Sequence, residues 1–184
     1  MTEGIAERRA DVRTDEVRAS FITSHRAAAV CARELSRLHD AIADGLEGWG
    51  VGTARAGDDP TLADVPVVRR TPARCLVQVG PVALTVAWLQ RAQGTVADGE
   101  LLVVVWRGEV AVRSPQGFER AHQHSGASSA TALWESVLVV SARSETEWSW
   151  APAGARGDGV SSSALAQRCV ERLRAAYAEC TSER

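Results

Sequence analysis

The first pattern along the chain is a row of apolar residues spaced as on one face of an α-helix. These residues follow one another at intervals of three, four or seven positions, which is a heptad-like spacing. Thr14 is suited to cap the start of such a helix, and the glycines from Gly45 to Gly50 are suited to end it. The pattern predicts one long helix over 14–49, after a weakly patterned lead-in over 1–13. Its apolar seam comprises Val17, Phe21, Ala28, Cys31, Leu35, Leu38, Ile42 and Trp49.

Strand-like patterns follow between residues 65 and 151, where apolar and polar positions alternate in short segments separated by turn residues. The continuous apolar run from Leu101 to Trp106 is typical of a central strand, whereas Pro66 places the first segment at a sheet edge. These segments predict five or six strands, mostly antiparallel. The strand-like segments are 65–70, 75–79, 82–89, 101–106, 110–112, 132–142 and 147–150, of which 110–112 follows 101–106 after either a tight turn or a bulge.

A second helix is predicted over 161–180, with one of the serines 161–163 as its cap and a frayed tail over 181–184. The order of elements indicates a single α+β domain over 14–180. We expect a two-layer sandwich in which both helices cover one face of the sheet. A curled half-barrel that grips the C-terminal helix is the alternative.

The amino-acid composition excludes several kinds of catalytic and binding site. The chain has 184 residues with 21 Lys plus Arg, and every one of these is Arg. A chain without Lys has no phosphate-binding Walker lysine and no Schiff-base lysine, and the absence of Asn excludes a Cys-His-Asn triad. Excess Ala and Arg without Lys is typical of a GC-rich bacterial genome.

Net charge and hydropathy indicate which partners and which cellular location to expect. The net charge of −2 gives no basic field for nucleic acid or anionic lipid, so neither partner is expected. The longest apolar run has six residues, which is far below the ~18 that a membrane-spanning helix needs. With no apolar leader at the N-terminus, we expect a cytoplasmic protein.

Few residues suggest a metal or cofactor site. His122 and His124 are close enough in sequence to share a metal ion, but no further ligand lies near them in a recognised spacing. The four cysteines, Cys31, Cys75, Cys169 and Cys180, lack a C-x-x-C spacing and are expected to be reduced and buried. We therefore expect no cofactor and no catalytic residue set.

Six tryptophans against one tyrosine are unusual, and two interpretations stay open. Trp134, Trp148 and Trp150 could form a stacking surface on the sheet, or they could fill the space between the sheet and the helices.

These observations favour a non-enzymatic cytoplasmic protein–protein interaction module, acting as an adaptor, assembly subunit or small regulatory subunit. Its partner would be another protein or a second copy of the chain, bound by the long helix or by the Trp-bearing sheet. The alternative is a small-molecule-binding protein or minor enzyme, with a Trp-lined pocket between the sheet and the C-terminal helix and a loop over 114–130 as its gate. Candidate contact residues are Phe21, Leu35, Leu38, Ile42, Trp49, Trp134, Trp148 and Trp150.

Overall fold

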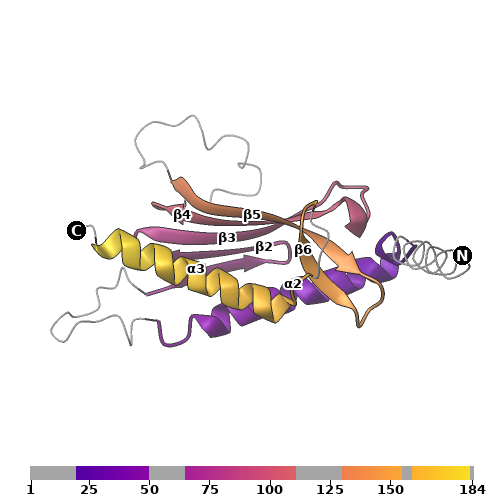
Figure 1. Ribbon diagram of the computed structural model, residues 1–184, viewed down its shortest axis with the longest axis horizontal. Coiled ribbons are helices and arrows are strands. Elements are labelled where there is room, and N and C mark those ends of the chain that lie inside the picture. The colour runs from indigo at the N-terminus through magenta and orange to yellow at the C-terminus, as the bar shows by residue number, and fades with distance from the viewer. Residues whose placement is uncertain (1–19, 50–64, 111–129, 155–158, 183–184) are drawn as a thin grey trace, which may run out of the picture.

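The computed structural model describes residues 20–49, 65–110, 130–154 and 159–182, and it shows an α+β fold (Figure 1). The sheet is antiparallel and open, with six strands in the order β1-β2-β3-β4-β5-β6, so each strand pairs with the next one in the sequence. The elements are α2 (His25–Gly45), β1 (Val67–Thr71), β2 (Arg74–Val79), β3 (Val82–Leu89), the short 3-10 helix η2 (Val96–Asp98), β4 (Glu100–Arg107), β5 (Thr131–Ala142), β6 (Trp148–Pro152) and α3 (Ser162–Ser182). The predicted antiparallel sheet and C-terminal helix are confirmed.

The core is one cluster of buried residues that come from the strands and from both helices. Val77, Leu84 and Val105 are cross-strand neighbours on β2, β3 and β4, and at most 1% of each is exposed. The alternation of apolar positions that predicted the strands therefore corresponds to a buried face. Helix α3 packs on β3, β4 and β6, and α2 packs along α3 (Figure 1).

The single long helix predicted over 14–49 is wrong in its described part. Residues 20–22 are helical, but the chain then leaves the helix at Thr23 and Ser24, and α2 starts at His25. Ser24 adopts an extended backbone conformation, with φ −83° and ψ 155°, and its hydroxyl accepts a hydrogen bond from the Ala27 amide at 3.2 Å. A serine side chain that satisfies a free amide in this way favours a new helix start over a continuous helix.

The C-terminal end of α2 also differs from the prediction, because the helix ends at Gly45 and residues 46–49 form turns. The Leu46 amide bonds to the Ala43 carbonyl at 3.0 Å, which tightens the last turn. The strand expected at 110–112 begins with Val110, which is not in a strand, and its other two residues lie outside the described residues. Over the described ranges, neither α2 nor α3 contains a stretch that is long and apolar enough to cross a bilayer.

Candidate functional site

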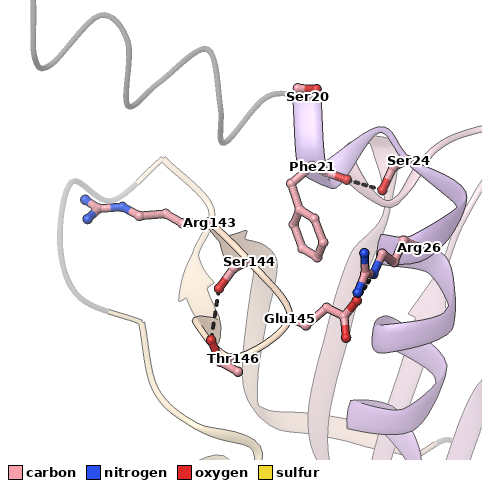
Figure 2. A pocket seen from close by; sticks show the side chains of 8 residues that line it. All are labelled: Ser20, Phe21, Ser24, Arg26, Arg143, Ser144, Glu145 and Thr146. Carbon is pink, nitrogen blue, oxygen red and sulfur yellow. Dashed lines mark hydrogen bonds and ion pairs between the residues drawn. The ribbon is translucent and has the colours of Figure 1, made fainter.

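A cleft lies between the start of α2 and the turn that joins β5 to β6 (Figure 2). Its volume is about 800 Å³, and we call it the hairpin cleft. From the helix side it is lined by Ser20, Phe21, Ser24 and Arg26, and from the turn by Arg143, Ser144, Glu145 and Thr146.

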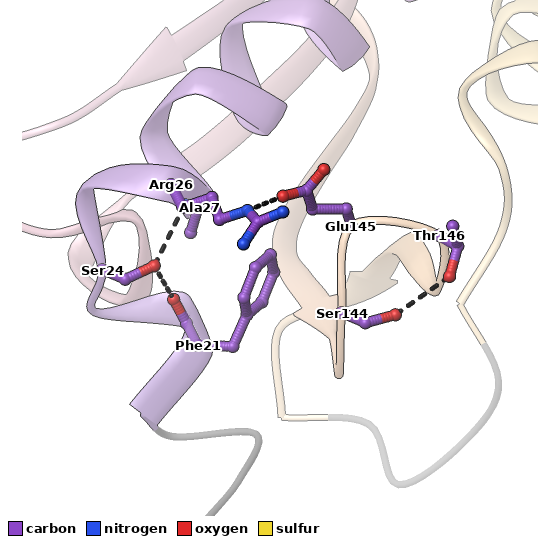
Figure 3. A network of polar contacts seen from close by, with 7 residues as sticks. All are labelled: Phe21, Ser24, Arg26, Ala27, Ser144, Glu145 and Thr146. Atoms are coloured by element: carbon purple, nitrogen blue, oxygen red, sulfur yellow. Dashed lines mark hydrogen bonds and ion pairs between the residues drawn. The ribbon is translucent and has the colours of Figure 1, made fainter.

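The interruption before α2 shapes the helix side of this cleft. The Ser24 hydroxyl donates a hydrogen bond to the Phe21 carbonyl at 2.7 Å while it accepts the one from Ala27, so one side chain fixes both sides of the break (Figure 3). The Phe21 ring lies toward the turn and is only partly covered by the rest of the chain (Figure 2). The break thus presents an aromatic ring at the cleft.

The two sides of the cleft are joined by an ion pair between Arg26 of α2 and Glu145 of the turn (Figure 3). The side chain of Arg26 is 77% exposed and that of Glu145 is 33% exposed. An ion pair so open to water stabilises a fold by at most ~1 kcal/mol, so it leaves both groups available for exchange with a partner. The turn itself is shaped by a hydroxyl–hydroxyl hydrogen bond of 3.1 Å between Ser144 and Thr146.

A second hollow adjoins the cleft, since Glu145 and Thr146 line both. Its volume is about 690 Å³, and we call it the serine hollow. It lies where the middle of α2 meets the start of α3 and the start of β6. Its remaining lining residues are Arg33, Glu34, Arg37, Trp148, Ser161, Ser162 and Ser163.

A buried polar chain forms the floor of the serine hollow. The Trp150 indole N–H donates to the Ser162 hydroxyl at 3.0 Å, and that hydroxyl donates to Glu34 at 2.9 Å. The other Glu34 oxygen accepts from Arg37 at 2.7 Å. Because each oxygen of this buried carboxylate has a donor, the charge of Glu34 is already satisfied within the chain.

Arginines outnumber acidic residues around the hairpin cleft and the serine hollow. Four arginines border them, and Glu145 and Glu34 pair with two of these, Arg26 and Arg37. Within the described part of the chain, the side chains of Arg33 and Arg143 make no ion pair or hydrogen bond. These two guanidinium groups are therefore available to carboxylates from outside the chain.

The structure separates the predicted contact residues into two groups. Leu35, Leu38, Ile42 and Trp150 are buried in the core, at 3%, 0%, 0% and 0% exposed, so a partner cannot reach them in this structure. Within α2, the seam residues Cys31, Leu35, Leu38 and Ile42 belong to one core cluster with the sheet and α3, whereas Ala28 is exposed. In the other group, Phe21, Trp49, Trp134 and Trp148 are partly covered.

The partly covered aromatic residues lie at different places. Phe21 lines the hairpin cleft and Trp148 lines the adjoining serine hollow, and Glu145 lines both. Trp134 lies under the guanidinium of Arg172 of α3, 5.6 Å from the ring centroid. The rings of Trp49 and Tyr177 pack in a T-shaped arrangement near the other end of the helices, with their centroids 5.7 Å apart. Of these four aromatic residues, Phe21 and Trp148 therefore line two adjoining hollows.

The metal hypothesis gains no support from this part of the protein. His122 and His124 lie outside the described residues. Among the residues that the structure does describe, no three His, Cys, Asp or Glu side chains form a group that could hold a metal ion. The four cysteines are free and buried, as the sequence predicted.

Sequence reasoning missed most of the polar residues of the site. Arg26, Glu145 and Ser162 come from three segments that only the fold brings together, so spacing along the chain carries no signal for them. Glu34 did offer a signal, because it stands beside Leu35 on the apolar side of α2, where a carboxylate requires a partner.

In three comparisons with known proteins, no protein family, no curated protein and no solved structure matches this chain.

Proposed function

We propose that the protein is a non-enzymatic, cytoplasmic protein–protein interaction module that binds an acidic segment of a partner at the hairpin cleft and the serine hollow. An adaptor, an assembly subunit or a small regulatory subunit would use such a site. The observation that carries the proposal is that each of two adjoining hollows is lined by an aromatic residue and by an arginine without an ion pair among the described residues. These are Phe21 and Arg143 in the hairpin cleft, and Trp148 and Arg33 in the serine hollow.

The residue types support a protein partner. Aromatic residues and arginine are enriched at protein interfaces, where they contribute much of the binding energy. Phe21 and Trp148 offer apolar area, and the serine and threonine hydroxyl groups around them offer hydrogen bonds to a peptide backbone. The unpaired arginines select for carboxylates, since a guanidinium group can bind a carboxylate through two parallel hydrogen bonds.

Contact through the α2 seam is the less favoured form of this proposal. Leu35, Leu38 and Ile42 belong to the core, so a partner could bind them only if α2 left the sheet. The proposal also keeps the two-layer arrangement with both helices on one sheet face. It is supported by the shared core of α2, α3 and the strands. The start of α2 lines the hairpin cleft, and the start of α3 lines the serine hollow.

Selection from a library of displayed random peptides tests the proposal, because it samples many candidate sequences and does not depend on an identified partner. The wild-type protein should enrich peptides that combine acidic with apolar side chains. The double variant Arg33→Glu/Arg143→Glu should lose these peptides, and their measured affinity for it should fall at least about tenfold. Arg91→Glu is the matched control, because Arg91 is an exposed arginine outside the cleft and the hollow.

The Phe21→Ala variant tests the apolar half of the site, and it should weaken the same peptides while the fold is retained by circular dichroism. Enrichment of basic peptides, no enrichment at all, or equal binding by the double variant and Arg91→Glu would each overturn the proposal.

A further inference from the structure

We propose that a groove between β5 and α3 binds a small organic acid with an apolar body. This site lies apart from the hairpin cleft, and it goes beyond the proposed function. The groove has a volume of about 680 Å³, which is within the usual range for small-molecule sites. Its lining residues are Trp134, Ser136, Leu138, Trp150, Pro152, Val160, Leu165, Arg168, Glu171, Arg172 and Ala175.

The groove exists because β6 is much shorter than β5. β6 pairs only with Leu138–Ala142, the second half of β5. The first half of β5, which carries Trp134 and Ser136, therefore has a neighbouring strand on one side only. Val77, Leu84 and Val105 form a buried row of cross-strand neighbours. The next residue in this row is Trp134 of β5, which is only partly covered.

One wall of the groove is apolar and follows the pleat of the strand. Trp134, Ser136 and Leu138 alternate along β5, so all three lie on the face that the helices cover. Pro152 of β6 pairs with Leu138 and extends this wall. Ser136, the smallest of these side chains, leaves the space at its centre.

The opposite wall belongs to α3 and carries charge. Arg168 and Arg172 are one helical turn apart and both line the groove. Arg172 lies over the Trp134 ring, which holds its guanidinium at the groove by a cation–π contact. The side chain of Arg168 makes no ion pair or hydrogen bond to the described residues, and Glu171 accepts a hydrogen bond of 3.0 Å from Gln167.

Charge and shape together select the occupant. Two arginines and one glutamate line the groove, so the charge of its lining is positive. It therefore attracts an anionic head group, either a carboxylate or a phosphate. The wall of Trp134, Leu138 and Pro152 offers apolar area to the body of the same molecule. A small molecule with one acidic group at the end of an apolar body fits both walls.

Binding of decanoate measured by titration calorimetry tests this assignment. Decyl phosphate, decanol and decylamine are the companion probes, since they keep the tail and vary the head group. Decanoate or decyl phosphate should bind at least about tenfold more tightly than decanol, and decylamine more weakly still. The stronger of the two anions identifies the preferred head group.

Two variants locate the ligand. Arg168→Gln removes a charge and should weaken the anion at least about tenfold. Ser136→Phe fills the groove and should abolish binding. Glu135→Phe is its matched control. Glu135 is exposed and lies on the opposite face of the same strand, so this variant adds the same ring outside the groove. Arg33→Gln should leave decanoate binding unchanged, since Arg33 lines the serine hollow instead.

The result that overturns the inference is equal binding of the four probes, equal binding by Ser136→Phe and Glu135→Phe, or no binding at millimolar concentration. A displayed peptide that loses its affinity in Ser136→Phe, with no binding of either anion, would assign the groove to a protein partner instead. If Arg33→Glu/Arg143→Glu no longer bound the acidic peptides but still bound decanoate, the peptide site and the groove would be shown to be independent of each other.

Discussion

Ser162 connects the core to the candidate site, although it is a single small residue at the start of α3. Its hydroxyl accepts from the indole of Trp150, which is completely buried, and donates to Glu34. Removal of the hydroxyl would leave one buried donor without a partner and one carboxylate oxygen without a donor. A buried polar group that loses its partner costs a fold more than the hydrogen bond itself contributes.

We expect Ser162→Ala to lower the free energy of unfolding by about 1–3 kcal/mol. Chemical denaturation followed by circular dichroism measures the change. Ser163→Ala is the matched control, because Ser163 is the next residue, is exposed, and its side chain makes no hydrogen bond within the described part of the chain. Equal stability of the two variants would show that water replaces the lost hydroxyl.

His39 is the second residue whose surroundings predict a measurable property. It is 4% exposed, and its Nε2 atom has no hydrogen-bond partner in the described structure. Burial lowers the pKa of His39 below its ordinary value of 6.5, and the nearby Arg70 lowers this pKa further, against an opposing effect of Asp40. Arg70 is held near by its ion pair with Asp40, at 2.6 Å.

The folded protein therefore binds a proton at His39 less readily than the unfolded chain does. The stability that the neutral imidazole contributes is complete above the unfolded pKa of 6.5 and decreases as the pH falls below it. We expect the unfolding free energy of the wild type to fall more steeply below pH 6.5 than that of His39→Gln, which has no imidazole to protonate. Parallel pH profiles for the two proteins would contradict this expectation.

The heptad-like seam shows that the sequence of a helix identifies its apolar face but not what this face contacts. It correctly identified Cys31, Leu35, Leu38 and Ile42 as one apolar face. Spacing cannot say whether such a face meets a partner or the chain's own sheet, because both contacts require the same residues. Here α3 and the sheet supply the contact, and Leu35, Leu38 and Ile42, which were predicted for a partner, lie in the core.

The break before α2 was missed for a related reason. Phe21 keeps the seam spacing across Thr23 and Ser24, so the apolar pattern continues through a point where the backbone does not. The polar groups decide the outcome, since the Ser24 hydroxyl satisfies a free amide of the new helix. The groove beside β5 was foreseen only in outline, because its size depends on where β6 ends.

We expect Ser24→Ala to lower the unfolding free energy by about 1 kcal/mol, because the Ala27 amide loses its cap. Ser24→Asp should restore most of the loss, since aspartate is also a good N-cap. Ser36→Ala, in the exposed middle of the same helix, should be neutral or slightly stabilising, because alanine favours helix formation there. Thermal unfolding of the three variants tests the order, and a loss in Ser24→Asp as large as in Ser24→Ala would contradict it.

At the scale of the whole molecule, three elements bring a cysteine into one core. Cys31 comes from α2, Cys75 from β2 and Cys169 from α3, and all belong to the same buried cluster. Burial raises the pKa of these thiols to about 12, about 11 and about 12, respectively. Cys180 is also buried, but it lies near the end of α3, where a helix opens most easily.

The reaction of these thiols with a disulfide reagent should therefore report on unfolding of the core. At neutral pH the three core cysteines carry almost no thiolate, which is the reactive form, and the reagent cannot reach them in the folded state. We expect Cys180 to react first, and Cys31, Cys75 and Cys169 to react together at a rate that rises with denaturant in step with global unfolding. Mass spectrometry of the modified peptides over time measures this order. Early modification of Cys75 alone would show that the sheet separates from the helices before the rest of the core opens.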